Sequence, residues 1–297
     1  MKKLRVAAVQ MNSLIGQTAK NLTVMGRYAK AAAKKKVQLV LFPELCLQGH
    51  WVSSEVFARA EPVPGPSVRR VERWCRDLGI YVSFGMAARQ DNVIYNAQVL
   101  VGPKGHAGTS CKLHMSGDEF MTYRGGDSIP VFDIGLAKLG QVVCYDNDFP
   151  EVARSLAVNG AEVILMPHAG RGGQWKTVAD ERKLVRRAKQ GFLEDYAMRA
   201  KENATYCVVT NQVGRGGFVD LYPRDSSFQP HHAGGVIFFD PAGQVIAESK
   251  TDRIEDELVV ADLDPDRLLS VRGSPNFPLR NRRPDLYAAL TRSIEGP

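Results

Sequence analysis

Hydrophobic positions along the chain follow a succession of strand-like and helix-like patterns that occurs twice. Each half opens with a strand, passes through a helix into a nearly all-apolar strand that stops at a proline, and ends with a helix, a strand and a hairpin. In the first half the expected strands are 4–11, 37–42, 80–84 and 96–101, with helices over 21–36 and 67–78. In the second half the expected strands are 139–144, 161–166, 205–210, 235–239 and 244–247, with helices opening at 149–151 and over 179–203.

The apolar strands 37–42 and 161–166 predict the layering of the fold. A strand without a polar face must be covered on both sides, by helices on one side and another sheet on the other. We therefore expect an α/β fold, a four-layer α-β-β-α sandwich with an internal pseudo-twofold. No long polar linker separates the halves, so residues 1–297 are expected to form a single domain. The Arg- and Pro-rich segment of about 265–297 is expected to wrap a neighbour or a dimer partner.

Composition excludes several classes of protein. The 297 residues are 44% hydrophobic and 24% charged, enough for a large core without disulfide or metal support. The net charge of +7 is spread over helix-like segments, so no nucleic-acid partner is expected. Five cysteines without a CxxC pair, no signal-peptide pattern and no apolar run of about 18 residues predict a cytoplasmic protein without a membrane partner.

Three reactive side chains fall near the carboxyl ends of strands, where such sheets bind ligands. Glu44 follows the apolar strand of the first half, Cys144 ends the opening strand of the second, and Lys112 lies in the segment between the halves. Each has an ordinary alternative: a helix cap for Glu44, a buried apolar residue for Cys144, and a solvent-facing loop for Lys112. Together they form a chemical set, because a thiol nucleophile needs a base and an ammonium stabilises a tetrahedral oxyanion.

The motifs around these residues resemble the signature blocks of the nitrilase superfamily, the carbon–nitrogen hydrolases. The resemblance runs in order through Leu41-Phe42-Pro43-Glu44-Leu45, Lys112-Leu113-His114 with Glu119, and Cys144-Tyr145-Asp146 with Phe149-Pro150-Glu151. It implies the same sandwich fold, commonly as a homodimer or higher homo-oligomer, and an amidohydrolase that acts on linear amides without a cofactor. By the same resemblance Cys144 is the nucleophile, Glu44 the general base and Lys112 the oxyanion stabiliser, while Glu119 positions the substrate and assists the base.

The resemblance also narrows the reaction. True nitrilases carry a Trp-Glu pair after the cysteine, where this chain has Tyr145-Asp146, so nitrile hydrolysis is not expected. Asp148 stands where many amidases and N-carbamoyl amidohydrolases of this superfamily have an arginine, and in some carbamoyl-amino-acid hydrolases basic residues just after the cysteine bind the substrate carboxylate. As a helix N-cap or otherwise, Asp148 removes one such partner. We therefore expect hydrolysis of a small carboxamide to a carboxylic acid and ammonia through a Cys thioester. The alternative is an N-carbamoyl amino acid or amine amidohydrolase, and a remote one is a catalytically silent binding subunit.

Four further residues are expected to contact a small-molecule amide or ureide substrate. Tyr145 lies beside the nucleophile, His168 follows the proline that stops the apolar strand of the second half, and Tyr123 and Arg171 lie in nearby loops. Ordinary loop packing is the alternative for His168, and a surface loop for Tyr123 and Arg171. The pair His231-His232 has no carboxylate or third histidine at ligand spacing, so no metal is expected.

Overall fold

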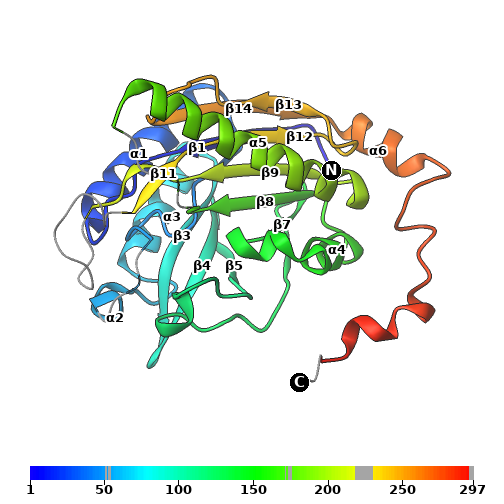
Figure 1. Cartoon of the computed structure of the whole chain (residues 1–297), viewed down its shortest axis with the longest axis horizontal. Helices are drawn as coiled ribbons and strands as arrows, with labels where there is room; N and C mark the ends of the chain where they lie inside the picture. Colours follow the sequence, from blue (N-terminus) through cyan, green and yellow to red (C-terminus); the bar gives the residue numbers. More distant parts are fainter. Residues whose placement is uncertain (51, 53–54, 171, 173–175, 218–229, 294–297) are drawn as a thin grey trace.

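Two six-stranded mixed sheets form the centre of the molecule in a computed structural model (Figure 1). The structure describes residues 1–50, 52, 55–170, 172, 176–217 and 230–293. The first sheet has the order β14-β1-β2-β3-β4-β5, and the second has the order β13-β12-β9-β8-β7-β6.

The first sheet is built from the first half of the chain and one late strand. Its strands are β1 (Leu4–Gln10), β2 (Leu39–Leu41), β3 (Tyr81–Gln90), β4 (Val93–Gly102), β5 (Gly105–Cys111) and β14 (Glu257–Leu263). The helices of this half are α1 (Thr18–Lys34), the short α2 (Glu55–Arg59) and α3 (Pro66–Leu78). The two long helices match the ranges that the apolar spacing predicts, with shifts of a few residues at the ends.

The second sheet is built from the second half of the chain. Its strands are β6 (Val131–Asp133), β7 (Lys138–Gln141), β8 (Val163–His168), β9 (Tyr206–Asn211), β12 (Val236–Phe239) and β13 (Val245–Glu248). The helices are α4 (Pro150–Val158) and α5 (Val178–Asn203), and β10 (Val213–Arg215) pairs with β11 (His231–Ala233) in a separate ribbon. None of the helices in the described residues has the length and apolar character needed to cross a membrane.

Strand directions repeat between the two sheets and confirm the doubled pattern. Along the first sheet from β14, neighbouring strands pair antiparallel, parallel, parallel, antiparallel and antiparallel. Along the second sheet from β6 the succession is the same. The opening strand of each half therefore lies inside its sheet. The antiparallel strand beside it is β14, from late in the chain, in the first sheet and β6, which directly precedes β7, in the second.

The layers follow from the alternation of side chains along the strands. In β1, Leu4, Val6 and Ala8 point into an apolar core shared by both sheets, while Ala7 and Val9 point into a second core with α1 and α3. A third core lies between the second sheet and the helices α4 and α5. The order of layers is therefore helices, sheet, sheet, helices, as the two apolar strands predict.

Two expectations about the segment around the cysteine are wrong. The strand expected over 139–144 ends at Gln141, and Cys144 instead begins the 3-10 turn η2 (Cys144–Asp148). Asp148 does not cap the following helix, because η2 continues through it and the helix takes Phe149 as its N-cap residue, without a side-chain cap. The carboxylate of Asp148 is exposed instead.

The end of the chain leaves the body of the molecule after the helix α6 (Pro265–Gly273) (Figure 1). Leu268 anchors α6 in the core between the sheets, and the guanidinium of Arg272 donates hydrogen bonds to the carbonyls of Ala204 and Ala161. The described residues beyond it, 274–293, contain two short 3-10 turns, η4 (Pro284–Leu286) and η5 (Ala288–Thr291), and their side chains are mostly exposed. Wrapping of a partner by this segment stays a prediction.

Candidate active site

The segments that follow β2, β5, β7 and β8 converge at one end of the sandwich. Strands β1 to β3 run parallel to one another, and so do β7 to β9, so that the carboxyl ends within each set lie at the same edge. Glu44 follows β2, Lys112 follows β5 directly, and Cys144 follows β7. The sequence-predicted set of base, cation and nucleophile is thereby brought together.

Glu44 is fully buried and its carboxylate is held on both oxygens. Oε1 accepts hydrogen bonds from Nδ2 of Asn96 at 2.7 Å and from Nζ of Lys112 at 3.0 Å. Oε2 accepts one from the backbone N–H of Ala169 at 2.7 Å. The backbone carbonyl of Glu44 also accepts a hydrogen bond, from Nε2 of Gln212 at 2.7 Å. Both the side chain and its backbone are therefore fixed, as a general base requires.

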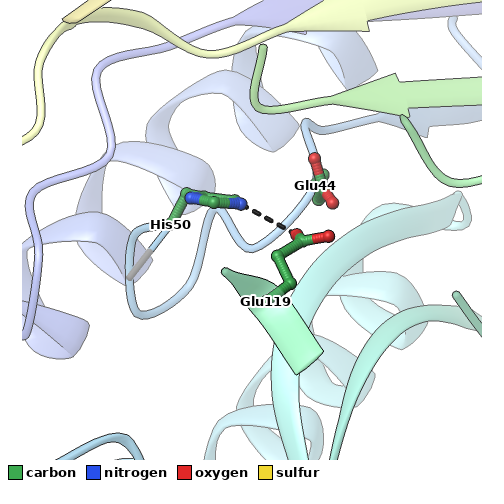
Figure 2. A group of neighbouring side chains, drawn as sticks. All are labelled: Glu44, His50 and Glu119. Carbon is green, nitrogen blue, oxygen red and sulfur yellow. Dashed lines mark hydrogen bonds and ion pairs between the residues drawn. The ribbon is translucent and has the colours of Figure 1, made fainter. Parts of the chain in front are cut away.

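Lys112 joins this carboxylate to a second one. Its ammonium, which has no exposed surface, lies 2.9 Å from Oε1 and 2.7 Å from Oε2 of Glu119. Glu119 begins the 3-10 turn η1 (Glu119–Met121), and its Oε2 also accepts hydrogen bonds from the backbone N–H and the hydroxyl of Ser116. His50, from the segment after β2, lies with Nε2 3.0 Å from Oε1 of Glu119 (Figure 2).

Cys144 opens a tight turn with a backbone conformation unusual for a residue with a side chain. Its φ is +50°, in the left-handed region, which costs about 1 kcal/mol or more outside glycine. Asn147 supports the turn, because its Nδ2 donates to the carbonyls of Cys144 at 2.9 Å and Val142 at 3.2 Å. Arg199 from α5 in turn donates to the carbonyl of Asn147. The strain is thus held by hydrogen bonds from within the turn and from α5.

Asp146 connects the turn that begins at Cys144 to the segment that contains Lys112, through hydrogen bonds. Its Oδ1 accepts hydrogen bonds from the backbone N–H and from Nδ1 of His114, each at 2.8 Å, and Oδ2 accepts one from the backbone N–H of Leu113 at 3.0 Å. The imidazole of His114 also stacks on Phe149, with ring centroids 3.8 Å apart. We call these contacts between Asp146, His114 and Phe149 the His114 clip. The clip fixes Lys112 and Cys144 relative to each other, because each lies two residues from one of its members.

Comparison with known proteins shows to which family the chain belongs. The family model for "Carbon-nitrogen hydrolase" matches residues 5–272. The chain belongs to the carbon–nitrogen hydrolase family of the nitrilase superfamily. A relative from Pyrococcus abyssi named "Nitrilase" is 32% identical to this hydrolase over 88% of this chain and 90% of its own length. An "(R)-stereoselective amidase" from Pseudomonas sp. is 28% identical over 99% and 96%, and an "N-carbamoylputrescine amidase" from Solanum lycopersicum is 27% identical over 96% and 94%.

Solved structures confirm the fold of the hydrolase. A carbon–nitrogen hydrolase from Helicobacter pylori G27 superposes with a TM-score of 0.78 at 21% identity, covering 98% of this chain and 99% of that one. The NitN amidase from Neterenkonia sp. AN1 superposes with a TM-score of 0.73 at 23% identity, covering 97% and 99%. The α-β-β-α sandwich predicted from the sequence is therefore confirmed.

Electrostatics set the resting protonation states of the site. Burial raises the pKa of the Cys144 thiol well above its ordinary value, and the charge of Glu44 raises it further, while Lys112 only partly opposes this. Burial alone would raise the pKa of Glu44, but the charge and hydrogen bond of Lys112 together with the charge of His50 outweigh it and hold that pKa below its usual range. Burial alone would lower the pKa of Lys112, but Glu44 and Glu119 raise it. A neutral thiol therefore faces an ionised base and an ammonium.

The four residues predicted to contact substrate have different surroundings. Tyr145 is partly exposed beside the nucleophile and meets Phe149 edge-on, with ring centroids 5.3 Å apart. His168 is buried, and its ring lies 5.1 Å from those of Phe192 and Tyr196. Arg171 lies outside the described residues. Contact of these side chains with a substrate stays a prediction.

Tyr123 lies deeper than a surface loop would place it. Its side chain is buried in an apolar cluster that includes Leu45, Ala87 and Ile94. Burial raises the pKa of the Tyr123 phenol, and the charges of Glu119 and Glu44 raise it further, so the ring lies within electrostatic reach of both carboxylates. The alternative of an exposed loop residue is therefore wrong for Tyr123.

Glu44, His50 and Glu119 also have the geometry of a possible metal site. Each offers one ligand atom, and these atoms lie within 4.8 Å of one another (Figure 2). The ammonium of Lys112, however, makes hydrogen bonds to both carboxylates. A cation bound by the three residues would have to compete with that ammonium for the same oxygens, so the donor set does not fit a resident metal.

Sequence reasoning missed several residues that shape this site. His50, Ser116 and the backbone N–H of Ala169 contact the buried carboxylates of Glu119 and Glu44, yet none belongs to a motif that the sequence singled out. Asn96 was expected only as the first residue of the strand 96–101. A buried carboxylate needs several donors, and that rule predicts that such partners exist without saying where in the chain they lie.

Proposed function

We propose that this hydrolase cleaves the C–N bond of a small carboxamide and releases a carboxylic acid and ammonia. Cys144 is the nucleophile, Glu44 the general acid and base, and Lys112 the oxyanion stabiliser, while Glu119 orients Lys112 and the substrate. The observation that carries the proposal is the buried group of Glu44, Lys112 and Glu119 next to Cys144. No cofactor is needed, because an acid, a base, a nucleophile and a cation suffice for this hydrolysis.

The first half of the reaction forms a thioester. Sγ of Cys144 bonds to the carbonyl carbon as its proton passes to Glu44, and the carbonyl electron pair moves to the oxygen beside the Lys112 ammonium. Attack and proton transfer belong together, because the resting thiol is neutral and its raised pKa disfavours a free thiolate. When the tetrahedral intermediate collapses, the C–N bond breaks and Glu44 returns its proton to the nitrogen, which leaves as ammonia.

The second half restores the thiol. Glu44 takes a proton from water as the oxygen of that water bonds to the thioester carbon, and Lys112 again faces the oxyanion. The C–S bond then breaks, the sulfur regains the proton held by Glu44, and the carboxylic acid leaves. One amide and one water give one acid and one ammonia, and both side chains return to their starting states.

Relatives and the charge around the nucleophile support a neutral carboxamide. Structures of the amidase from Nesterenkonia sp. AN1 are described as holding acrylamide or butyramide, and one as carrying the acetamide moiety of fluoroacetamide on its active-site cysteine. In this chain the exposed carboxylate of Asp148 lies within electrostatic reach of Lys112. A carboxylate there repels an anionic substrate, which favours a neutral one.

A ureide is the second candidate, favoured by the relatives named N-carbamoylputrescine amidase. Burial raises the pKa of Asp148, and the neighbouring charge of Asp195 raises it further, while the charges of Arg199 and Lys112 oppose this. Two carboxylates therefore lie close together near the turn of Cys144. Paired carboxylates favour a cationic group nearby over an anionic one. Among ureides we therefore expect an N-carbamoyl amine to be preferred over an N-carbamoyl amino acid.

A substrate panel tests this order. Ammonia release is measured with butyramide, benzamide, N-carbamoylputrescine, an N-carbamoyl amino acid and butyronitrile under one condition. We expect butyramide or benzamide to have the highest kcat/KM, and the N-carbamoyl amino acid to fall at least about tenfold below. A tenfold advantage for the carbamoyl amino acid would contradict the role given to Asp148, and preferred cleavage of the nitrile would contradict the carboxamide assignment.

The nucleophile is tested separately. Cys144→Ala should lower kcat by about 10³-fold or more, because the covalent step is lost. Cys207→Ala is the matched control, because that thiol is fully buried in the core between the second sheet and its helices. Intact-mass spectrometry should show that iodoacetamide inactivates the wild type in step with one adduct, which Cys144→Ala no longer forms. Inactivation that tracks an adduct on another cysteine would assign the nucleophile elsewhere.

A further inference from the structure

His50 is a buried histidine that the catalytic scheme above does not use. Its side chain is 7% exposed and lies on the same connection as Glu44, between β2 and α2. Nε2 points at Glu119 and lies 3.0 Å from Oε1 (Figure 2). Nδ1 is buried and has no hydrogen-bond partner among the described residues. The contact with Glu119 is therefore the interaction that a substitution of His50 would remove.

The ammonium of Lys112 has a limited number of donors. A lysine ammonium carries three N–H groups, and its oxygen neighbours are Oε1 of Glu44 and both carboxylate oxygens of Glu119, at 3.0, 2.9 and 2.7 Å. If each of these oxygens holds one N–H, none remains for the oxyanion of the substrate. Lys112 can stabilise that oxyanion only if one of the two carboxylates leaves an N–H group unbound, and Glu119 holds two of the three.

Other donors also bind the carboxylate of Glu119 and can replace N–H groups of Lys112 there. Oε2 of Glu119 accepts hydrogen bonds from the backbone N–H of Ser116 at 2.9 Å and from its hydroxyl at 3.0 Å. Among the described residues Oε1 has no equivalent pair, and beside Lys112 its donor there is Nε2 of His50. Because an ionised carboxylate only accepts hydrogen bonds, Nε2 carries the hydrogen in this contact.

We propose that His50 is a positioning residue for the oxyanion site. Its Nε2–H binds Oε1 of Glu119 and so frees an N–H of Lys112 to meet the oxyanion as it forms. His50 acts through Glu119 and Lys112 and does not touch the reacting atoms. The inference rests on the proposed role of Lys112 in the hydrolysis.

Two polar substitutions separate the donor from the bulk of the side chain. His50→Gln keeps an N–H group at about the reach of Nε2, whereas the amide of His50→Asn is too short to meet Glu119. We expect His50→Asn to lower kcat by about tenfold or more with KM changed less than about threefold, because the lost interaction acts on the transition state. His50→Gln should keep kcat within about threefold of the wild type.

A second background tests the route through Glu119. In Glu119→Ala the partner of Nε2 is absent, so adding His50→Asn should change kcat less than about twofold. His106→Gln is the matched control and should leave kcat unchanged, because His106 is exposed at the start of β5 and contacts Thr109.

Several outcomes would overturn the inference. An equal loss in His50→Gln and His50→Asn would show that the donor is not what matters, and a loss confined to KM would mean that His50 binds substrate directly. The same loss from His50→Asn with and without Glu119 would mean that it acts elsewhere. Each variant is compared with the wild type by its kcat on the substrate that the wild type turns over best, and the concentration of active sites is measured by alkylation of Cys144. If the proposed substrate class were wrong, the wild type would not turn over carboxamides best. If Lys112 were dispensable, Lys112→Ala would keep its kcat. Both results are separate from the comparison of the His50 variants.

Discussion

At the scale of single residues, Lys112 carries a positive charge with no exposed surface between two buried carboxylates. Removing one member of such a group leaves a buried charge without its partner, which costs about 3–5 kcal/mol in other proteins. The arrangement is therefore costly to perturb, and its members act as one unit. Neither carboxylate can be replaced without changing the surroundings of the ammonium.

The compact charge of Lys112 cannot be replaced by arginine. We expect both Lys112→Ala and Lys112→Arg to lower kcat by about 10²-fold or more with a smaller change in KM, because a planar guanidinium does not fit a site shaped for an ammonium. Steady-state kinetics with a carboxamide measure both values, and circular dichroism checks that the variants fold. A kcat near that of the wild type in either variant would remove the ammonium from the mechanism.

His168 predicts a pH dependence of stability. Burial lowers the pKa of His168 to about 4, from an ordinary value near 6.5, so the folded state keeps the ring neutral. The unfolded chain takes up a proton at higher pH, so this contribution is present above about pH 6.5 and is lost as the pH falls toward 4. The free energy of unfolding should fall by up to about 1.4 kcal/mol per pH unit in that window.

Urea unfolding of the wild type and His168→Phe at several pH values between 4 and 7.5 measures this slope. Phenylalanine keeps a ring between Phe192 and Tyr196 but cannot take up a proton. The variant should lose the part of the slope that belongs to His168, while His106→Phe, at an exposed site, should keep it. Equal slopes in the wild type and His168→Phe would contradict the lowered pKa.

At the scale of elements, the site depends on connections that are themselves fastened together. The His114 clip joins the segment after β5 to the turn η2, and the N–H of Ala169 after β8 joins the second sheet to Glu44 after β2 of the first. Cys144 and Glu44, the proposed nucleophile and base, therefore follow strands of different sheets and are held by contacts between loops. Loosening one such contact should affect the rate more than the stability of the fold.

The His114 clip gives a prediction of this kind. His114→Ala removes one hydrogen bond and one ring contact at a partly exposed position, so it should cost only about 1 kcal/mol of stability. It should nevertheless lower kcat by about tenfold, because Cys144 and Lys112 lose their fixed separation. His114→Asn, whose amide can replace Nδ1, should recover part of the loss. Thermal unfolding and kcat are compared in both variants, and an unchanged kcat in His114→Ala would show that the clip is not needed.

At the scale of the whole molecule, the described residues of the terminal segment after α6 are mostly exposed. Beyond α6 the chain extends away from the sheets (Figure 1). Leu286 and Leu290 in this segment are 66% and 67% exposed. Exposed apolar side chains on an extended arm are typical of a surface that packs against another molecule. In the expected homodimer, the partner subunit would cover that surface.

Replacing Leu286 and Leu290 together by serine should therefore weaken self-association. We expect the wild type to sediment as a dimer or larger species in analytical ultracentrifugation, and the double variant to shift toward the monomer at micromolar concentration. Val245→Ser, at an exposed position of β13, is the matched control and should leave the association unchanged. A monomeric wild type, or a double variant that associates as tightly, would contradict a role of the segment in the interface.

The sequence by itself determined the central strands and the main helices of each half, their layering and the set of reactive side chains, although it did not predict the edge strands β6 and β14. The apolar runs that form β2 and β8, each followed by a proline, predict strands covered on both faces. The spacing of α1 and α3 predicts helices with one buried side. These features depend on residues a few positions apart, where the period of the backbone fixes which side chains share a face. The motifs around Glu44, Lys112 and Cys144 are local in the same sense.

The tertiary structure alone decided which groups surround those side chains. The donors to Glu44 come from Asn96 and Ala169, 52 and 125 positions along the chain, and His50 reaches Glu119 across 69 positions. Asp148 shows that even a local expectation can fail, because the turn that begins at Cys144 continues through it and leaves no room for a cap. Hydrogen bonds depend on distances in space, and the packing of the two sheets and their loops sets those distances. A pattern over neighbouring residues does not predict them.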